Sequence, residues 1–232
     1  LDTISNGNNF YIDDDLGGGL DTGVSYTYKV KSYVVIADKK IESDLSAIKA
    51  ERPRPDQVTH LTCDYDQYNS LALSWDPCDG ADNYIIEIST NSNFSISTTT
   101  TDTATDNQYT ATGLQTGRAY YFRVTSSVTA DGQTTLGLVS TPVGKRPVPS
   151  TPTDLSATIT SSGYIQLSWT ASLDGNSGYY IKRSSTSTGP YSTIATITSP
   201  NQVKYVDGSV VVSQLYYYKI CPFVTYSGTR YA

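Results

Sequence analysis

The chain has 232 residues and a formal net charge of −6, with 16% charged and 38% hydrophobic residues. The acidic balance argues against general binding to nucleic acid or to an anionic membrane. No apolar run approaches the roughly 18 residues that a membrane-spanning helix needs. Tyrosine is abundant, at 20 residues against 4 Phe and 2 Trp. Because tyrosine and threonine favour strands while glycine and asparagine favour turns, the composition predicts an all-β protein.

The first strand pattern is Tyr26-Thr-Tyr28-Lys-Val30, which follows a Leu20-Asp-Thr-Gly23 turn. In a strand, alternate side chains share one face, so Tyr26, Tyr28 and Val30 are expected to point the same way.

An acidic stretch, Asp13-Asp14-Asp15 with Asp21, lies in the loop that leads to this strand. Clustered carboxylates can bind Ca²⁺, which takes about six to eight oxygen ligands. The spacing is not that of an EF-hand, and the later parts of the chain have no counterpart. A solvated acidic loop is therefore favoured over a metal site.

A full set of strand patterns follows the linker Arg52-Pro53-Arg54-Pro55. Within the strand that begins at Tyr120, the side chains of Tyr120, Phe122 and Val124 are predicted to face inward and Tyr121 outward. A Ser/Thr-rich stretch, residues 95–105, predicts a polar edge strand. The expected strands cover residues 58–65, 71–75, 84–88, 109, 120–124 and 136–143.

A third set of strand patterns begins after the linker Arg146-Pro147-Val148-Pro149. Its strands are marked by Trp169, by Tyr179-Tyr-Ile-Lys-Arg183, by residues 188–194 and by Tyr216-Tyr-Tyr218-Lys-Ile220.

Three kinds of marker recur with one period. Tyr26, Tyr120 and Tyr216 are 94 and 96 residues apart, and the Leu-Ser-Trp triplets end 94 residues apart at Trp75 and Trp169. The two proline linkers keep the same interval of 94. A period near 95 residues with about seven short strands predicts tandem immunoglobulin-like sandwiches.

The repeats resemble fibronectin type III modules, in particular those of bacterial style. The resemblance implies that Trp75 and Trp169 are the core tryptophans of strand B. It also implies that Tyr26 and Tyr120 form tyrosine corners, each after a Leu-x-x-Gly turn. The corner at Tyr216 departs from the pattern, because residues 210–214 contain no glycine. That corner could be built differently.

Alignment of the repeats predicts three modules. Residues 1–52 would be the C-terminal part (strands E–G) of a module, residues 53–147 a complete module, and residues 148–232 a module that lacks most of its last strand. The favoured interpretation is a fragment of a longer protein. The alternative is that strands of another chain complete the half-module, as in donor-strand assembly.

The sequence offers no catalytic group. His60 is the single histidine, and nothing around it resembles a Ser-His-Asp triad. A zinc site needs about four clustered Cys or His ligands, whereas Cys63, Cys78 and Cys221 are scattered. The sequence therefore predicts a protein that is not an enzyme, with no cofactor and no bound metal.

Other polar features have structural interpretations. Cys63 and Cys78 are expected to be free thiols rather than a disulfide. Asn93-Phe94-Ser95 fits the N-glycosylation triplet, although a bacterial origin would argue against occupancy. The outward tyrosines Tyr121, Tyr180 and Tyr217 could bind a partner, but pairing across an exposed sheet face is favoured.

The sequence thus favours a non-catalytic structural or interaction region of a secreted or surface-displayed protein, such as a fibre, filament or adhesin stalk. The alternative is a set of spacer modules in a secreted polysaccharide-degrading enzyme. The expected partners are other proteins, including copies of itself in a fibre, with carbohydrate as a further possibility. Fold alone does not choose between these functions.

Overall fold

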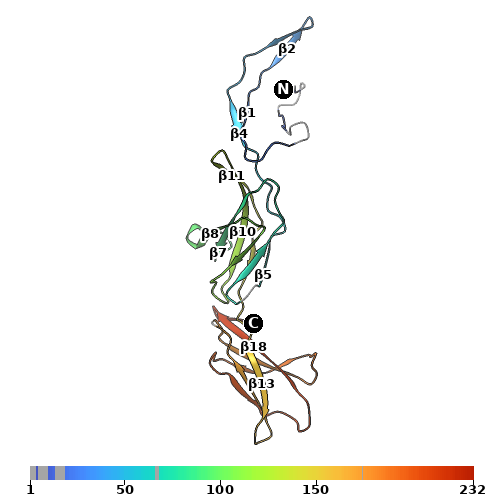
Figure 1. Ribbon diagram of the computed structural model, residues 1–232, viewed down its shortest axis with the longest axis vertical. Coiled ribbons are helices and arrows are strands. Elements are labelled where there is room, and N and C mark those ends of the chain that lie inside the picture. The colour runs from blue at the N-terminus through green and yellow to red at the C-terminus, as the bar shows by residue number, and fades with distance from the viewer. Residues whose placement is uncertain (1–3, 5–9, 14–18, 66–67, 174) are drawn as a thin grey trace.

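The structure is a computed structural model that describes residues 4, 10–13, 19–65, 68–173 and 175–232. It is all-β, and its strands form three groups that follow one another along the long axis (Figure 1). These groups are the N-terminal segment (residues 19–52), the middle sandwich (residues 56–145) and the C-terminal sandwich (residues 150–231). The predicted fold of tandem sandwiches is confirmed. Among the described residues, no helix is long and apolar enough to cross a membrane.

The N-terminal segment is a long two-stranded ribbon. Strand β1 (Tyr26–Tyr28) pairs antiparallel with β4 (Lys49–Glu51), and further out β2 (Tyr33–Ile36) pairs with β3 (Lys39–Glu42). Every residue of β2 and β3 is exposed. The ribbon therefore buries little of its own apolar surface.

The middle sandwich consists of two antiparallel sheets. One has the order β5-β6-β9 and the other β11-β10-β7-β8, with β12 paired to the opposite end of β10. Strand β8 lies at the edge of its sheet, which matches the polar edge strand predicted for residues 95–105. The strands are β5 (Thr62–Tyr65), β6 (Leu71–Ser74), β7 (Asn83–Ser89), β8 (Thr99–Ala104), β9 (Gln108–Ala111), β10 (Tyr120–Ala130), β11 (Gln133–Val139) and β12 (Val143–Lys145).

The single strand expected over residues 136–143 is divided in the structure. Strand β11 pairs with the far half of β10, and β12 pairs with its near half, at Tyr120–Phe122. Pro142 lies between the two strands and has no N–H to donate to a sheet. Ser140 fills the gap, because its N–H donates to the carbonyl of Val124 and its Oγ accepts the N–H of Val124, both at 2.9 Å.

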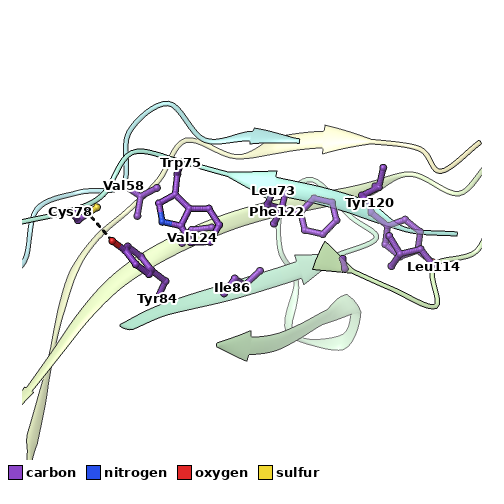
Figure 2. Packing of buried hydrophobic residues seen from close by; sticks show 12 residues of the cluster. Val58, Leu73, Trp75, Cys78, Tyr84, Ile86, Leu114, Tyr120, Phe122 and Val124 are labelled. Carbon is purple, nitrogen blue, oxygen red and sulfur yellow. Dashed lines mark hydrogen bonds between the residues drawn. The ribbon is translucent and has the colours of Figure 1, made fainter. Parts of the chain in front are cut away.

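The core of the middle sandwich lies between the two sheets (Figure 2). Strand β10 alternates buried and half-buried residues, so Phe122 and Val124 point inward and are fully buried. Trp75 is 3% exposed and meets Tyr84 edge-on, with ring centroids 5.1 Å apart. Edge-to-face aromatic pairs add to the stability that burial alone provides.

The C-terminal sandwich repeats this architecture. Its sheets have the orders β13-β14-β17 and β16-β15-β18-β19. Trp169 is 5% exposed and meets Tyr179 edge-on at 5.4 Å, which reproduces the pair in the middle sandwich. The strands are β13 (Thr153–Ile159), β14 (Ile165–Thr170), β15 (Gly178–Ser184), β16 (Ser192–Ile197), β17 (Lys204–Asp207), β18 (Tyr217–Tyr226) and β19 (Thr229–Tyr231).

Candidate functional site at the joints between sandwiches

The residues considered for catalysis or metal binding do not gather into one site. The His60 ring Nδ1 lies 2.6 Å from Asp76 Oδ2, and both side chains are more than half exposed. Asp13 is near Tyr28, where burial and a hydrogen bond from the Tyr28 hydroxyl to Asp13 raise the pKa of Tyr28. Asp14 and Asp15 lie outside the described residues. In the part of the chain that the structure describes, no three His, Cys, Asp or Glu side chains form a group that could hold a metal ion.

The thiols and the glycosylation triplet have ordinary structural surroundings. Cys63, Cys78 and Cys221 are free, and burial raises the pKa of the Cys63 thiol to about 11. Asn93 is exposed in a turn, where its side-chain oxygen accepts the N–H of Ser95 at 3.0 Å.

The tyrosines predicted to point outward are half-buried. Tyr180 lies 4.7 Å, centroid to centroid, from Phe223. Tyr121 packs over Gly144 on the neighbouring strand, since a Cβ added at that glycine would lie 2.8 Å from the Tyr121 ring. These two rings contact their own sheets.

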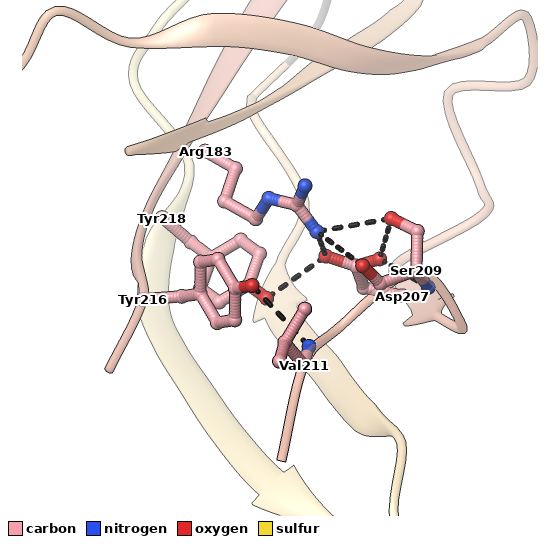
Figure 3. Close-up of polar contacts among 6 residues, drawn as sticks. All are labelled: Arg183, Asp207, Ser209, Val211, Tyr216 and Tyr218. Atoms are coloured by element: carbon pink, nitrogen blue, oxygen red, sulfur yellow. Dashed lines mark hydrogen bonds and ion pairs between the residues drawn. The ribbon is translucent and has the colours of Figure 1, made fainter. Parts of the chain in front are cut away.

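A polar cluster in the C-terminal sandwich surrounds one buried carboxylate (Figure 3). Asp207 is 1% exposed. Its carboxylate accepts hydrogen bonds from Arg183 Nη1 at 2.7 Å, from the Tyr218 hydroxyl at 2.9 Å, and from the N–H and hydroxyl of Ser209 at 2.9 and 2.7 Å. The Arg183 guanidinium also stacks on Tyr216, 4.6 Å from the ring centroid.

This cluster replaces apolar core positions. By repeat spacing and strand register, Asp207, Arg183 and Tyr218 stand where the middle sandwich has Ala111, Ile88 and Phe122. Burial alone would raise the pKa of Asp207, but the hydrogen bonds from Ser209, Arg183 and Tyr218 outweigh it and hold that pKa below its ordinary value. A carboxylate with so many donors is an anchor for the structure.

Three tyrosine corners mark the equivalent ends of the repeats. The hydroxyl of each tyrosine accepts the backbone N–H five residues earlier: Tyr26 from Asp21 at 3.0 Å, and Tyr120 from Gln115 at 2.9 Å. Tyr216 accepts from Val211 at 3.2 Å. The third corner therefore makes the same hydrogen bond, despite the missing glycine. Ser213 adopts the left-handed conformation there, with φ of +64°.

The turns before the first two corners form the joints between consecutive groups of strands. At the joint between the middle and C-terminal sandwiches, Gly117 donates its N–H to the Pro147 carbonyl at 2.8 Å. The Gly117 carbonyl accepts from Arg146 Nη1, also at 2.8 Å. The linker is thus bonded to the turn on both sides of the glycine.

The following sandwich closes against this turn. A Cβ added at Gly117 would lie 2.8 Å from Val224 Cγ1, and one added at Gly175 would lie 2.6 Å from Thr116 Oγ1. Thr116 and Val224 are 7% and 6% exposed. The two surfaces are therefore in direct contact, with a glycine on each side.

The joint between the N-terminal segment and the middle sandwich uses the same contacts, one repeat earlier. Gly23 donates to the Pro53 carbonyl at 2.9 Å, and Arg52 donates to the Gly23 carbonyl. A Cβ at Gly23 would lie 2.9 Å from Val128 Cγ1. The Thr22 side chain likewise meets Gly80, which corresponds to Gly175.

Equivalent residues thus build both joints, at intervals of 94 to 96 positions. The sequence contained the turn and the proline linker as repeated patterns. It gave no sign that Val128, Val224, Gly80 and Gly175 complete the joints. Their repeated spacing was the available signal, but valine and glycine are too common for it to stand out.

Comparison with known proteins agrees with this architecture. Residues 56–143, which cover both sheets of the middle sandwich, match the family model described as the fibronectin type III domain. No curated protein matches the chain.

Two solved structures are similar to the chain. The FN1-FN3 domains of chicken CNTN1 are 15% identical, with a TM-score of 0.37, and the alignment covers 91% of this chain and 75% of that one. A segment of two fibronectin type III domains from chicken tenascin is 16% identical, with a TM-score of 0.48, and the alignment covers 72% of this chain and 90% of that one.

Proposed function

We propose that this chain is a non-catalytic structural and interaction region of a multi-module protein that is secreted or displayed on a cell surface. Its role would be to hold modules in a semi-rigid row, as in a fibre, filament or adhesin stalk. The observation that carries this proposal is the repeated joint. Two successive connections use the same turn, the same Arg-Pro linker and the same valine contact.

The geometry of the joint supports a stiff connection. Proline fixes φ in the linker, and Pro147 is almost fully buried. The linker carbonyl and the arginine side chain both bond to the turn, so the linker has little freedom of its own. Because both joints repeat these contacts, one local geometry would set the direction of the whole row.

The proposed modules are residues 1–52, 53–147 and 148–232. Residues 19–52 would be the E–G part of a module whose remaining strands lie outside this range. Val30 supports this assignment, because it is 66% exposed whereas its counterpart Val124 is fully buried under the opposite sheet. The exposed face of the N-terminal ribbon thus corresponds to the face of β10 that β5, β6 and β9 cover within the middle sandwich.

The partners of such a region would be other proteins, including copies of this chain in a fibre. Carbohydrate is a second class of ligand that exposed aromatic side chains could serve. The acidic surface favours neither nucleic acid nor an anionic membrane.

The proposal can be tested by measuring whether the two sandwiches move as one body. Residual dipolar couplings of the chain in a dilute aligned medium yield an alignment tensor for each sandwich. A stiff row predicts tensors of the same magnitude and orientation for residues 56–145 and 150–231. Tensors that differ clearly in magnitude would show independent motion and would contradict the proposed structural role.

A further inference from the structure

The turn that precedes each tyrosine corner has one backbone shape and two different sequences. The residues at positive φ are Gly23 at +79°, Gly117 at +81° and Ser213 at +64°. The residues just before them are Thr22, Thr116 and Val212. The Thr-Gly pair thus occurs in the two turns that meet a following group of strands, and the third turn carries Val-Ser.

In the two joints, the positive φ favours glycine, and the neighbouring side chain requires it. A Cβ at Gly117 would stand 2.8 Å from Val224 Cγ1 and 3.2 Å from Tyr226 Cβ. Val224 is a short, branched side chain on a paired strand and cannot swing away. A serine at this position would therefore force the two surfaces apart.

The threonine contact imposes a second condition. The Thr116 side chain reaches into the space above Gly175, where a Cβ would stand 2.6 Å from Thr116 Oγ1. Valine at position 116 would place a methyl group where the Thr116 hydroxyl now lies. The joint is thus a matched fit, with Thr-Gly on the preceding module and Gly and Val on the following one.

The third turn is held by a different device. Arg183 donates to Ser209 Oγ at 3.0 Å as well as to Asp207, and it stacks on Tyr216. The polar cluster therefore fixes the start of this turn from inside the sandwich. The turn itself presents apolar side chains to solvent, with Val212 89% and Leu215 64% exposed.

We propose that the Thr-Gly turn is a docking element that selects the following module, and that the Val212-Ser213 turn does not accept a module of the same kind. The partner that the Thr-Gly turn fits is the end of a fibronectin type III-like module with a glycine and a valine at the positions of Gly175 and Val224. The row would then be stiff through the first two joints, and no equivalent joint would form beyond the C-terminal sandwich. This inference rests on the proposed stiff row.

The test transfers the third turn into the second joint. The double variant Thr116→Val, Gly117→Ser puts the Val-Ser sequence at the end of the middle sandwich. Ser213 shows that serine fits this turn, so the middle sandwich is expected to fold. The expected result is that the alignment tensors of the two sandwiches, equal in the parent chain, become different in magnitude and orientation.

Gly113→Ser is the matched control. Gly113 lies in the same loop at φ of +68°, but a Cβ there would meet nothing within 4 Å. This variant carries the same backbone strain without the clash, so it is expected to keep the tensors of the parent chain. If it separates the tensors as the double variant does, strain in the loop is responsible and the inference is wrong.

A rescue variant tests the contact directly. In a Gly117→Ser chain, the further change Val224→Ala removes the side chain that the serine meets. Equal tensors are expected to return in the Gly117→Ser, Val224→Ala chain. If unequal tensors persist there, Val224 is not the selecting contact.

The outcomes separate this inference from the proposed function. Unequal tensors in the parent chain would contradict the stiff row itself. Equal tensors in the parent chain and also in the Thr116→Val, Gly117→Ser variant would leave the stiff row in place and overturn the selectivity alone.

Discussion

At the scale of single residues, the two sandwiches solve the same packing problem with different chemistry. The middle sandwich fills one end of its core with Ala111, Ile88 and Phe122. The C-terminal sandwich places Asp207, Arg183 and Tyr218 there, and every acceptor of the carboxylate is engaged. A buried carboxylate is costly to desolvate, so the ion pair of Asp207 with the partly exposed Arg183 depends on this complete set of hydrogen bonds.

Asp207→Asn is expected to destabilise the C-terminal sandwich by about 3 kcal/mol at neutral pH, because it leaves the Arg183 charge without its partner. The pKa of Asp207 is below its ordinary value in the folded state. Its stabilising effect is therefore fully present above the ordinary pKa of about 4 and is lost as the pH falls through the lower folded value. The difference in the free energy of unfolding between the variant and the parent should narrow below about pH 4.

Urea unfolding followed by Trp169 fluorescence, in a Trp75→Phe background, measures this difference as a function of pH. Asp154→Asn is the control, since Asp154 is an exposed carboxylate bonded to Thr153 and Thr170. It should cause a much smaller loss. A difference for Asp207→Asn that stays constant down to pH 2 would refute the role given to the ionised carboxylate.

Trp75→Ala is expected to destabilise the middle sandwich by about 3–5 kcal/mol, because a large side chain that is 3% exposed would leave a cavity beside Tyr84. Chemical denaturation followed by far-UV circular dichroism measures the change, while the fluorescence of Trp169 reports the unfolding of the C-terminal sandwich separately. A loss below about 1 kcal/mol would mean that Trp75 contributes little to the core.

At the scale of strands, β1 and β10 have the same alternation and different surroundings. Strand β10 is covered by the opposite sheet and alternates buried with half-buried residues, whereas β1 has no buried residue. Strand pairing alone seldom stabilises a ribbon, because a sheet needs an apolar face covered by a second layer.

Amide hydrogen exchange is therefore expected to be fast in β1 to β4 and slow in β7 and β10 of the same chain. Exchange measured by mass spectrometry at increasing protein concentration distinguishes two sources of cover. If a second copy covers the ribbon, protection of residues 26–51 rises with concentration. Strong protection of the ribbon in a demonstrated monomer would contradict its assignment as an uncovered half-module.

At the scale of the whole molecule, the joints set the direction in which each group of strands follows the one before it. Each joint brings together a turn, a linker and the end of the next sandwich, and none of these is a long element. Arg146 belongs to the linker and connects the other two parts, because it donates to the Gly117 carbonyl and stacks on Tyr231, 4.6 Å from the ring centroid.

Arg146→Ala is expected to loosen the second joint without unfolding either sandwich. Small-angle X-ray scattering should show a broader distribution of interatomic distances, and the alignment tensors should diverge. Arg118→Ala is the control, since Arg118 bonds Thr90 within the middle sandwich. Identical scattering from the Arg146→Ala chain and the parent would show that the arginine does not hold the joint.

The sequence by itself determined the sandwich fold and the repeat. Alternation decides which side of a strand is apolar, and the 94-residue spacing of Trp75 and Trp169 is a property of the chain alone. The tyrosine corners at Tyr26 and Tyr120 were implied by the resemblance to fibronectin type III modules, and each is a local bond over five residues. The form of the corner at Tyr216 could not be predicted, because residues 210–214 contain no glycine and Ser213 adopts the positive φ instead.

Only the tertiary structure decided which distant residues meet. Gly117 and Val224 are more than 100 residues apart, and neither belongs to a motif that names the other. The same holds for Arg183 and Asp207, whose side chains come from opposite sheets. Periodicity fixes the face on which a side chain lies, but the partner across a core or a joint depends on how two surfaces approach each other.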